Sequence, residues 1–127
     1  MKYLIILLLL SNLAMAGKND IITTIIKIES RGNINAFNKK EDACGILQIR
    51  PVMVREVNRI SGKSYKLNDR WCWEKSIEMF IIFQNKYNPE WNEEKAARIW
   101  NGGQRGMRKK STDKYYKKYI TLKNEKT

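Results

Sequence analysis

The sequence predicts a single, mainly helical domain with little β-sheet. Apolar residues recur at helical spacing in five segments, and glycine, proline and asparagine residues separate those segments. A chain of 127 residues is long enough for one compact domain but not comfortably for two. We therefore expect one domain over residues 17–127, preceded by a short apolar leader.

The first sixteen residues have the features of a secretory signal peptide. Lys2 precedes an apolar run that ends at Leu10, and Ala14-Met15-Ala16 places small residues at the spacing of a cleavage site. The apolar run falls short of the ~20 residues that a transmembrane helix needs. We expect residues 1–16 to be removed, leaving no stable membrane span; a retained membrane anchor is the alternative.

The first helix of the domain is expected to begin at Asn19 or Asp20, either of which can cap it, and to end at Gly32. Its isoleucines recur at helical spacing: Ile21, Ile22, Ile25, Ile26 and Ile28. Residues 33–42 are polar and rich in asparagine and lysine, which indicates a loop that could hold a short, irregular hairpin.

The rest of the chain alternates between helices and polar connections. Pro51 can open a helix that ends at Ser61-Gly62, and a polar turn follows to Asp69. The most apolar helix, residues 73–87, is the expected centre of the core. Two further helices are expected at about residues 92–100 and at residues 113–122, separated by a basic loop over residues 104–111.

The amino-acid composition limits the kinds of partner and of catalytic group that this chain can have. The chain has 25 basic and 13 acidic residues, a net charge of +12, which favours anionic polymers as partners. It contains no histidine, which excludes a Ser-His-Asp or Cys-His catalytic set and any histidine-ligated metal. Catalysis would therefore depend on carboxylates, and we expect neither a metal nor a cofactor.

Cys44 and Cys72 are the only cysteines. In an exported chain, two cysteines most simply form one disulfide, and two separate buried thiols are the alternative.

Glu29 is the unusual residue of the first helix. It lies three residues after Ile26 and four after Ile25, on the apolar stripe that should face the core. Burial first, and the negative end of the helix dipole second, should raise the pKa of this carboxyl group, as a general acid requires. A glutamate at the edge of the stripe that reaches water or Arg31 is the alternative.

Four segments, in order, resemble the motifs of the soluble lytic transglycosylase family of lysozyme-like enzymes. They are Glu29-Ser30, Gly45-Ile46-Leu47-Gln48-Ile49-Arg50-Pro51, Ile99-Trp100-Asn101-Gly102-Gly103, and Ser111 to Tyr119. The chain departs from the family's pattern at four places. Trp100 replaces the usual tyrosine, and Ser111 replaces a glutamate. Tyr116 and Tyr119 replace valines, and residues 33–42 lack the usual small residues.

The resemblance implies a lysozyme-like fold and cleavage of the β-1,4 bond between N-acetylmuramic acid and N-acetylglucosamine, leaving a 1,6-anhydro end. Glu29 would be the catalytic acid and base, and no second carboxylate would be needed. The implied substrate-binding residues are Ser30, Gln48, Ile49, Trp100, Asn101 and Tyr115. Core packing is the alternative role for Trp100, and Tyr116 and Tyr119 compete with Tyr115. The expected partner is a peptidoglycan strand in the periplasm or outside the cell.

Other functions are weighed against this one. If Glu41 or Asp42 faced Glu29, it could position water and make the protein a hydrolytic lysozyme, although the surrounding run of charges favours solvated side chains. A non-catalytic binder of glycan or another anionic polymer is a second alternative, which intact Glu29 argues against. Nucleic acid is not expected as a partner, because the basic residues are scattered over several helices. No protein partner is predicted.

Overall fold

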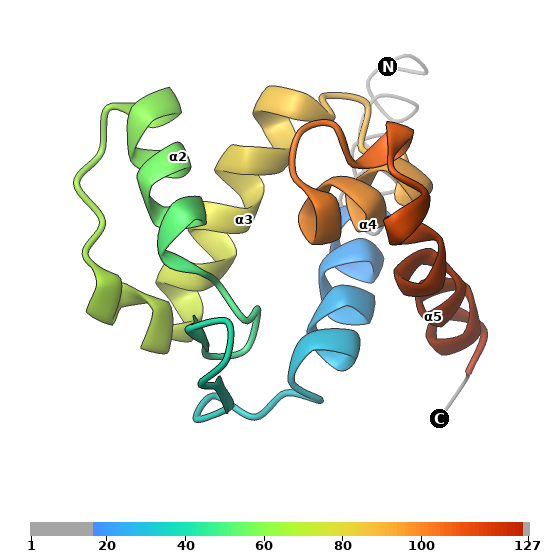
Figure 1. The fold of residues 1–127 in the computed structure, drawn as a ribbon, viewed down its shortest axis with the longest axis horizontal. Coiled ribbons are helices and arrows are strands. Elements are labelled where there is room, and N and C mark those ends of the chain that lie inside the picture. The colour runs from blue at the N-terminus through green and yellow to red at the C-terminus, as the bar shows by residue number, and fades with distance from the viewer. Residues whose placement is uncertain (1–16, 126–127) are drawn as a thin grey trace, which may run out of the picture.

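Helices provide most of the regular structure in residues 17–125, the part of the chain that the computed structural model describes. After a helix over residues 17–29, the order is β1 (Phe37–Asn38), β2 (Ala43–Cys44), α2 (Pro51–Ser61), η1 (Leu67–Trp71), α3 (Trp73–Tyr87), α4 (Glu93–Gly102), η2 (Gly106–Arg108), η3 (Lys110–Thr112) and α5 (Asp113–Asn124). The prediction of a mainly helical domain with minimal sheet is confirmed (Figure 1). The predicted signal peptide, residues 1–16, lies outside the described residues.

Local sequence signals fix several helix ends. Pro51 is the first residue of α2, and Gly62 ends that helix in the left-handed conformation at φ 71°. Asn92 caps α4, because its side chain accepts a hydrogen bond from the backbone N–H of Lys95 at 2.9 Å. The predicted cap of the first helix is wrong, since residues 17–20 are already helical.

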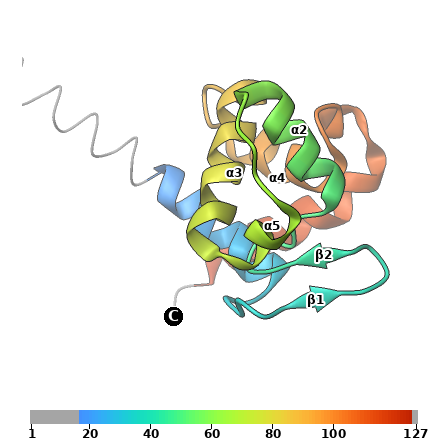
Figure 2. The same cartoon turned by 90° about the vertical axis from the view of Figure 1, so that its left-hand side faces the viewer.

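Two of the connections contain more structure than the sequence predicts, whereas the hairpin after the first helix was one of the predicted options. The polar turn before α3 includes the 3₁₀-helix η1, and the basic loop after α4 includes η2 and η3. The polar segment after the first helix forms a two-stranded antiparallel hairpin, with Phe37 opposite Cys44 and Asn38 opposite Ala43 (Figure 2). This hairpin stands to one side of the helices.

The core lies around α3, which packs against α2 (Figure 1). Phe80 and Phe83 of α3 are almost fully buried, and both contact the Trp100 ring of α4, with ring centroids 4.7 and 5.9 Å apart. The first helix contributes Ile21, Ile22 and Ile25 to the same core. None of the helices within residues 17–125 is long and apolar enough to cross a membrane.

Buried Arg70 ties the hairpin to the segment that follows it. Its guanidinium donates to the backbone carbonyls of Asp42 at 2.6 Å, Ile49 at 3.1 Å and Leu67 at 2.9 Å. It also forms an ion pair with the Asp42 carboxylate at 3.3 Å. Three hydrogen bonds to buried or partly buried carbonyls are worth more than this partly exposed ion pair. Arg70 therefore holds residues 42–49 in place.

Candidate active site

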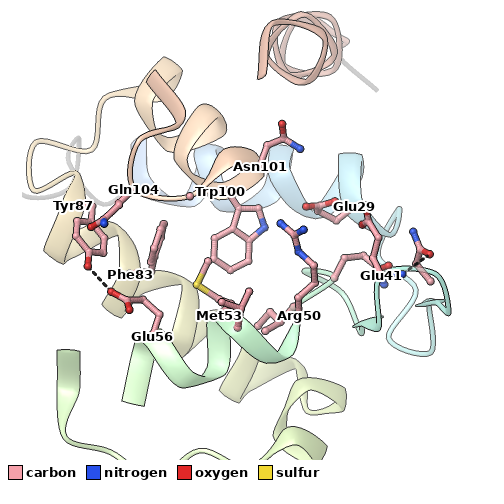
Figure 3. A pocket seen from close by; sticks show the side chains of 15 residues that line it. Glu29, Glu41, Arg50, Met53, Glu56, Phe83, Tyr87, Trp100, Asn101 and Gln104 are labelled. Carbon is pink, nitrogen blue, oxygen red and sulfur yellow. Dashed lines mark hydrogen bonds between the residues drawn. The ribbon is translucent and has the colours of Figure 1, made fainter. Parts of the chain in front are cut away.

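A cleft of about 430 Å³ runs between the hairpin, α2 and α4 (Figure 3). Its lining combines carboxylates, amides and apolar surfaces: Glu29, Asn38, Glu41, Gln48, Ile49, Arg50, Val52, Met53, Glu56, Phe83, Tyr87, Trp100, Asn101, Gly103 and Gln104. Residues from the beginning, middle and later part of the chain thus meet around one space. Within residues 17–125 no group of three histidine, cysteine or carboxylate side chains could hold a metal ion.

Glu29, the last residue of the first helix, projects into this cleft and is partly buried. Burial raises the pKa of its carboxyl group from 4.5 to about 7, in the direction that the sequence predicts. The hydrogen bond from Tyr115 and the positive charge of Arg50 oppose this rise in pKa, while the negative charge of Glu41 adds to it. Glu29 can therefore hold a proton near neutral pH.

Tyr115 of α5 is the tyrosine that reaches Glu29. Its hydroxyl donates to Glu29 Oε2 at 3.2 Å, whereas the Tyr119 hydroxyl lies near Glu93 and Tyr116 stacks on Tyr119. Burial raises the pKa of Tyr115 well above its usual value, so this hydroxyl stays protonated. It is a permanent donor to the carboxylate form of Glu29.

Gln48 and Ile49 line the cleft as one wall, but Ser30 does not. Gln48 has a left-handed backbone (φ 51°), and its Nε2 donates to the carbonyls of Ala36 at 3.0 Å and Gly45 at 2.9 Å. Its amide oxygen accepts no hydrogen bond within residues 17–125, so it can accept one from a ligand. The Ser30 hydroxyl instead donates to the Ile46 carbonyl at 2.7 Å, which joins the helix end to this wall.

Trp100 and Asn101 supply the side of the cleft that α4 forms. Trp100 is 5% exposed and its indole N–H donates to the Leu47 carbonyl at 3.3 Å, so it is a core residue with one edge in the cleft. Asn101 is exposed, and Figure 3 places its amide across the cleft from Arg50. An amide there can both donate and accept hydrogen bonds with a ligand in the cleft.

The two acidic residues of the hairpin turn have different surroundings. Glu41 lines the cleft, and its charge reaches Glu29. Asp42 does not line the cleft, because its carboxylate pairs with Arg70. Both residues are exposed, as the run of charges indicates.

Sequence reasoning missed the charged groups that α2 brings to the cleft. Arg50 lies just before the first residue of α2, and at the other end of the cleft Glu56 accepts hydrogen bonds from Tyr87 and Arg59. Arg50 directly follows the residues predicted to form the cleft wall and precedes Pro51, and this position in the sequence could have indicated that it lies at the cleft. Glu56 and Arg59, three residues apart, look like any surface pair, so no local signal marks them.

A mainly helical domain with a small two-stranded hairpin beside an open cleft is consistent with a lysozyme-like fold. The chain matches the family model of the transglycosylase SLT domain over residues 12–122, and it belongs to that family. The match supports a transglycosylase-type action on peptidoglycan. No curated protein and no solved structure matches the chain.

Proposed function

We propose that this protein is an exported lytic transglycosylase that cleaves peptidoglycan strands between N-acetylmuramic acid and N-acetylglucosamine, with Glu29 as general acid and base. The observation that carries the proposal is the Glu29 carboxyl group. It lies in the cleft, has a pKa of about 7, and is held by the Tyr115 hydroxyl. A non-catalytic glycan binder would gain nothing from a proton-donating carboxyl group in its cleft.

In the first step, protonated Glu29 gives its proton to the glycosidic oxygen, and the bond from that oxygen to the anomeric carbon breaks. The acetamido oxygen of N-acetylmuramic acid stabilises the positive charge at the anomeric carbon, so a second protein carboxylate is not required. Tyr115 donates to the carboxylate that remains, which favours this ionised form of Glu29.

In the second step, ionised Glu29 takes the proton of the sugar's own 6-hydroxyl group. That oxygen attacks the anomeric carbon, forms the 1,6-anhydro ring and releases the acetamido group. Attack within one molecule gains greatly in effective concentration over attack by water. Glu29 is protonated again at the end, so the cycle is complete without a net change in the protein.

The amide oxygen of Gln48 and the amide of Asn101 are suited to hydrogen-bond N-acetyl and hydroxyl groups. Trp100 and Ile49 are almost fully buried, so each can present only a small apolar edge to the sugar. In this proposal Ser30 acts through its bond to Ile46, as a positioning residue for the wall.

Hydrolysis is the second candidate, because Glu41 lines the same cleft as Glu29. A second carboxylate about 6.5–9.5 Å from the acid could activate water in an inverting reaction, and one at about 5–5.5 Å could act in a retaining reaction. The ion pair with Arg70 engages the Asp42 carboxylate elsewhere, so Glu41 is the residue to test.

Mass analysis of fragments released from purified peptidoglycan distinguishes the two reactions. A transglycosylase leaves anhydro ends that are lighter by one water and lack a reducing end, and Glu41→Gln should still produce them. Glu29→Gln should lose at least ~10²-fold in rate while remaining folded, because an amide keeps the shape but cannot donate the proton. Mainly reducing ends, together with a large loss in Glu41→Gln, would establish the hydrolase. A fully active, folded Glu29→Gln variant would refute the role of Glu29.

The proposed export of the protein bears on its two cysteines. Cys44 and Cys72 are free thiols in the structure. Gly45, which follows Cys44, lies against the backbone of Arg70 and Trp71, which precede Cys72. We propose that the two cysteines pair in an oxidising compartment. The pairing would add a covalent link to the contact that Arg70 already makes.

A further inference from the structure

Arg50 is the only cationic side chain among the residues that line the cleft. It is exposed, and Figure 3 shows its guanidinium extending from the start of α2 into the space between Glu29 and Trp100. Among residues 17–125 it forms no ion pair and no side-chain hydrogen bond. Other arginines near the cleft and core are engaged: Arg59 by Glu56, Arg70 by Asp42, and Arg98 by Glu94 and Asp113.

The other charged residues that line the cleft are acidic. Glu29, Glu41 and Glu56 all line the same cleft, and Glu56 is already paired with Arg59. An anionic group entering the cleft would find its one favourable charged partner among the lining residues at Arg50. A guanidinium that projects into a cleft without a protein partner presents a fork of N–H donors that matches a carboxylate.

The proposed substrate carries such carboxylates. Each N-acetylmuramic acid bears a lactyl ether that ends either in a free carboxylate or in a peptide with carboxylates of its own. We propose that Arg50 is a specificity-determining residue that binds a carboxylate on the N-acetylmuramic acid side of the substrate. This inference rests on the proposed function, because it takes the glycan to lie in the Glu29 cleft.

The charge of Arg50 would then act on two groups in turn. Without substrate its charge favours the ionised form of Glu29. When a substrate carboxylate neutralises the guanidinium, that influence on Glu29 is weakened, and the carboxyl group keeps its proton for the glycosidic oxygen. Binding of the substrate carboxylate would thereby favour the protonated form of Glu29.

The test measures binding in a Glu29→Gln background, which mimics the protonated acid and does not cleave. Three ligands of equal glycan length are compared: a neutral N-acetylglucosamine tetramer, a peptide-free N-acetylglucosamine–N-acetylmuramic acid tetrasaccharide, and the same tetrasaccharide carrying peptides. Adding Arg50→Gln should weaken binding of carboxylate-bearing ligands by about tenfold and of the neutral tetramer by less than about twofold. Arg50→Lys should fall between, because it keeps the charge but not the fork.

Arg55→Gln is the matched control: Arg55 lies on α2, the helix that follows Arg50, is exposed and does not line the cleft. It should leave every affinity unchanged. A loss with the peptide-free ligand identifies the lactyl carboxylate, and a loss only with the third ligand identifies the peptide. Equal weakening for neutral and charged ligands, no weakening at all, or no binding of charged glycan by the Arg50-containing protein would each overturn the inference. Failure of the proposed function would instead appear in the wild-type cleavage products.

Discussion

Glu29 lies between neighbours that act on its proton in opposite directions. The Tyr115 hydroxyl and the Arg50 charge lower the pKa of this carboxyl group, while Glu41 and, above all, burial raise it. The balance leaves the pKa at about 7. A group that must donate a proton and then accept one is best served by a pKa near the working pH.

The rate of glycan cleavage should therefore fall as the pH rises through about 7, where Glu29 loses its proton. Tyr115→Phe removes an influence that lowers the pKa, so the falling limb of the pH profile should move to higher pH. Glu41→Gln removes one that raises the pKa, so the limb should move to lower pH. Profiles of kcat/KM for the three proteins test this. Shifts in the same direction would contradict the assignment of these neighbours.

The stability of the protein should also depend on the protonation of Glu29, even in the absence of substrate. Because folding raises the pKa of Glu29 from 4.5 to about 7, its contribution to stability is complete below pH 4.5 and is lost as the pH rises to about 7. The difference corresponds to about 3 kcal/mol. Glu29→Gln has no such loss, so its stability relative to wild type should increase by roughly this amount between these pH values.

Denaturant unfolding measured at pH 4.5, 6 and 8 checks this dependence. Glu90→Gln, at an exposed position on the connection between α3 and α4, is the control and should show no comparable trend. A constant difference between Glu29→Gln and wild type across this range would mean that folding does not alter the proton affinity of Glu29.

At the scale of single residues, the sequence is informative where the environment follows from helical spacing. The position of Glu29 on the apolar stripe predicts its burial and the direction of its pKa shift, because that stripe faces the core. Its neighbours Tyr115 and Arg50 come from other elements and are not predicted by helical spacing. Arg50 and Glu56 are different. Whether they enter the cleft depends on how α2 is oriented against α4, which no local pattern in the sequence specifies.

Among the elements, the wall over residues 45–49 depends on a close approach of two backbones. A Cβ atom on Gly45 would lie 2.1 Å from the Arg70 carbonyl oxygen, and Gly45 has φ 78°. Only glycine satisfies both conditions. The wall that carries Gln48 and Ile49 is thus positioned by contact with η1.

Gly45→Ala should destabilise the protein by at least about 3 kcal/mol, since a steric clash adds to the backbone strain. Gly62→Ala is a matched control: Gly62 also has positive φ (71°), but a Cβ there would meet nothing within 4 Å. It should cost only about 1 kcal/mol. Unfolding midpoints in denaturant give both values, and similar costs at the two sites would show that η1 does not press on the wall.

Helix positions were largely predictable because their signals are local: Pro51 and Gly62 bound α2, and Asn92 caps α4. The hairpin could only be anticipated as an option, since Phe37 and Asn38 pair with residues that a polar turn brings back. Its anchor, buried Arg70, could not be foreseen, because a lone arginine in a polar segment normally stays in solvent.

For the whole molecule, the prediction concerns the two thiols. A Cys44–Cys72 disulfide in the exported protein would close a loop of about 29 residues and contribute roughly 3 kcal/mol by restricting the unfolded chain. Non-reducing mass spectrometry of protein recovered from the export compartment should find this bridge. Recovery of folded protein with two alkylatable thiols would exclude it.

The hydrogen bond between Tyr115 and Glu29 joins residues 86 positions apart in the chain. During synthesis, Glu29 emerges early, whereas its hydroxyl partner arrives only with α5. A nascent chain that has grown only as far as α4 carries the acid without the group that favours its ionised form. This hydrogen-bonded pair is therefore complete only once the final helix has docked, and fragments that end before α5 should lack it.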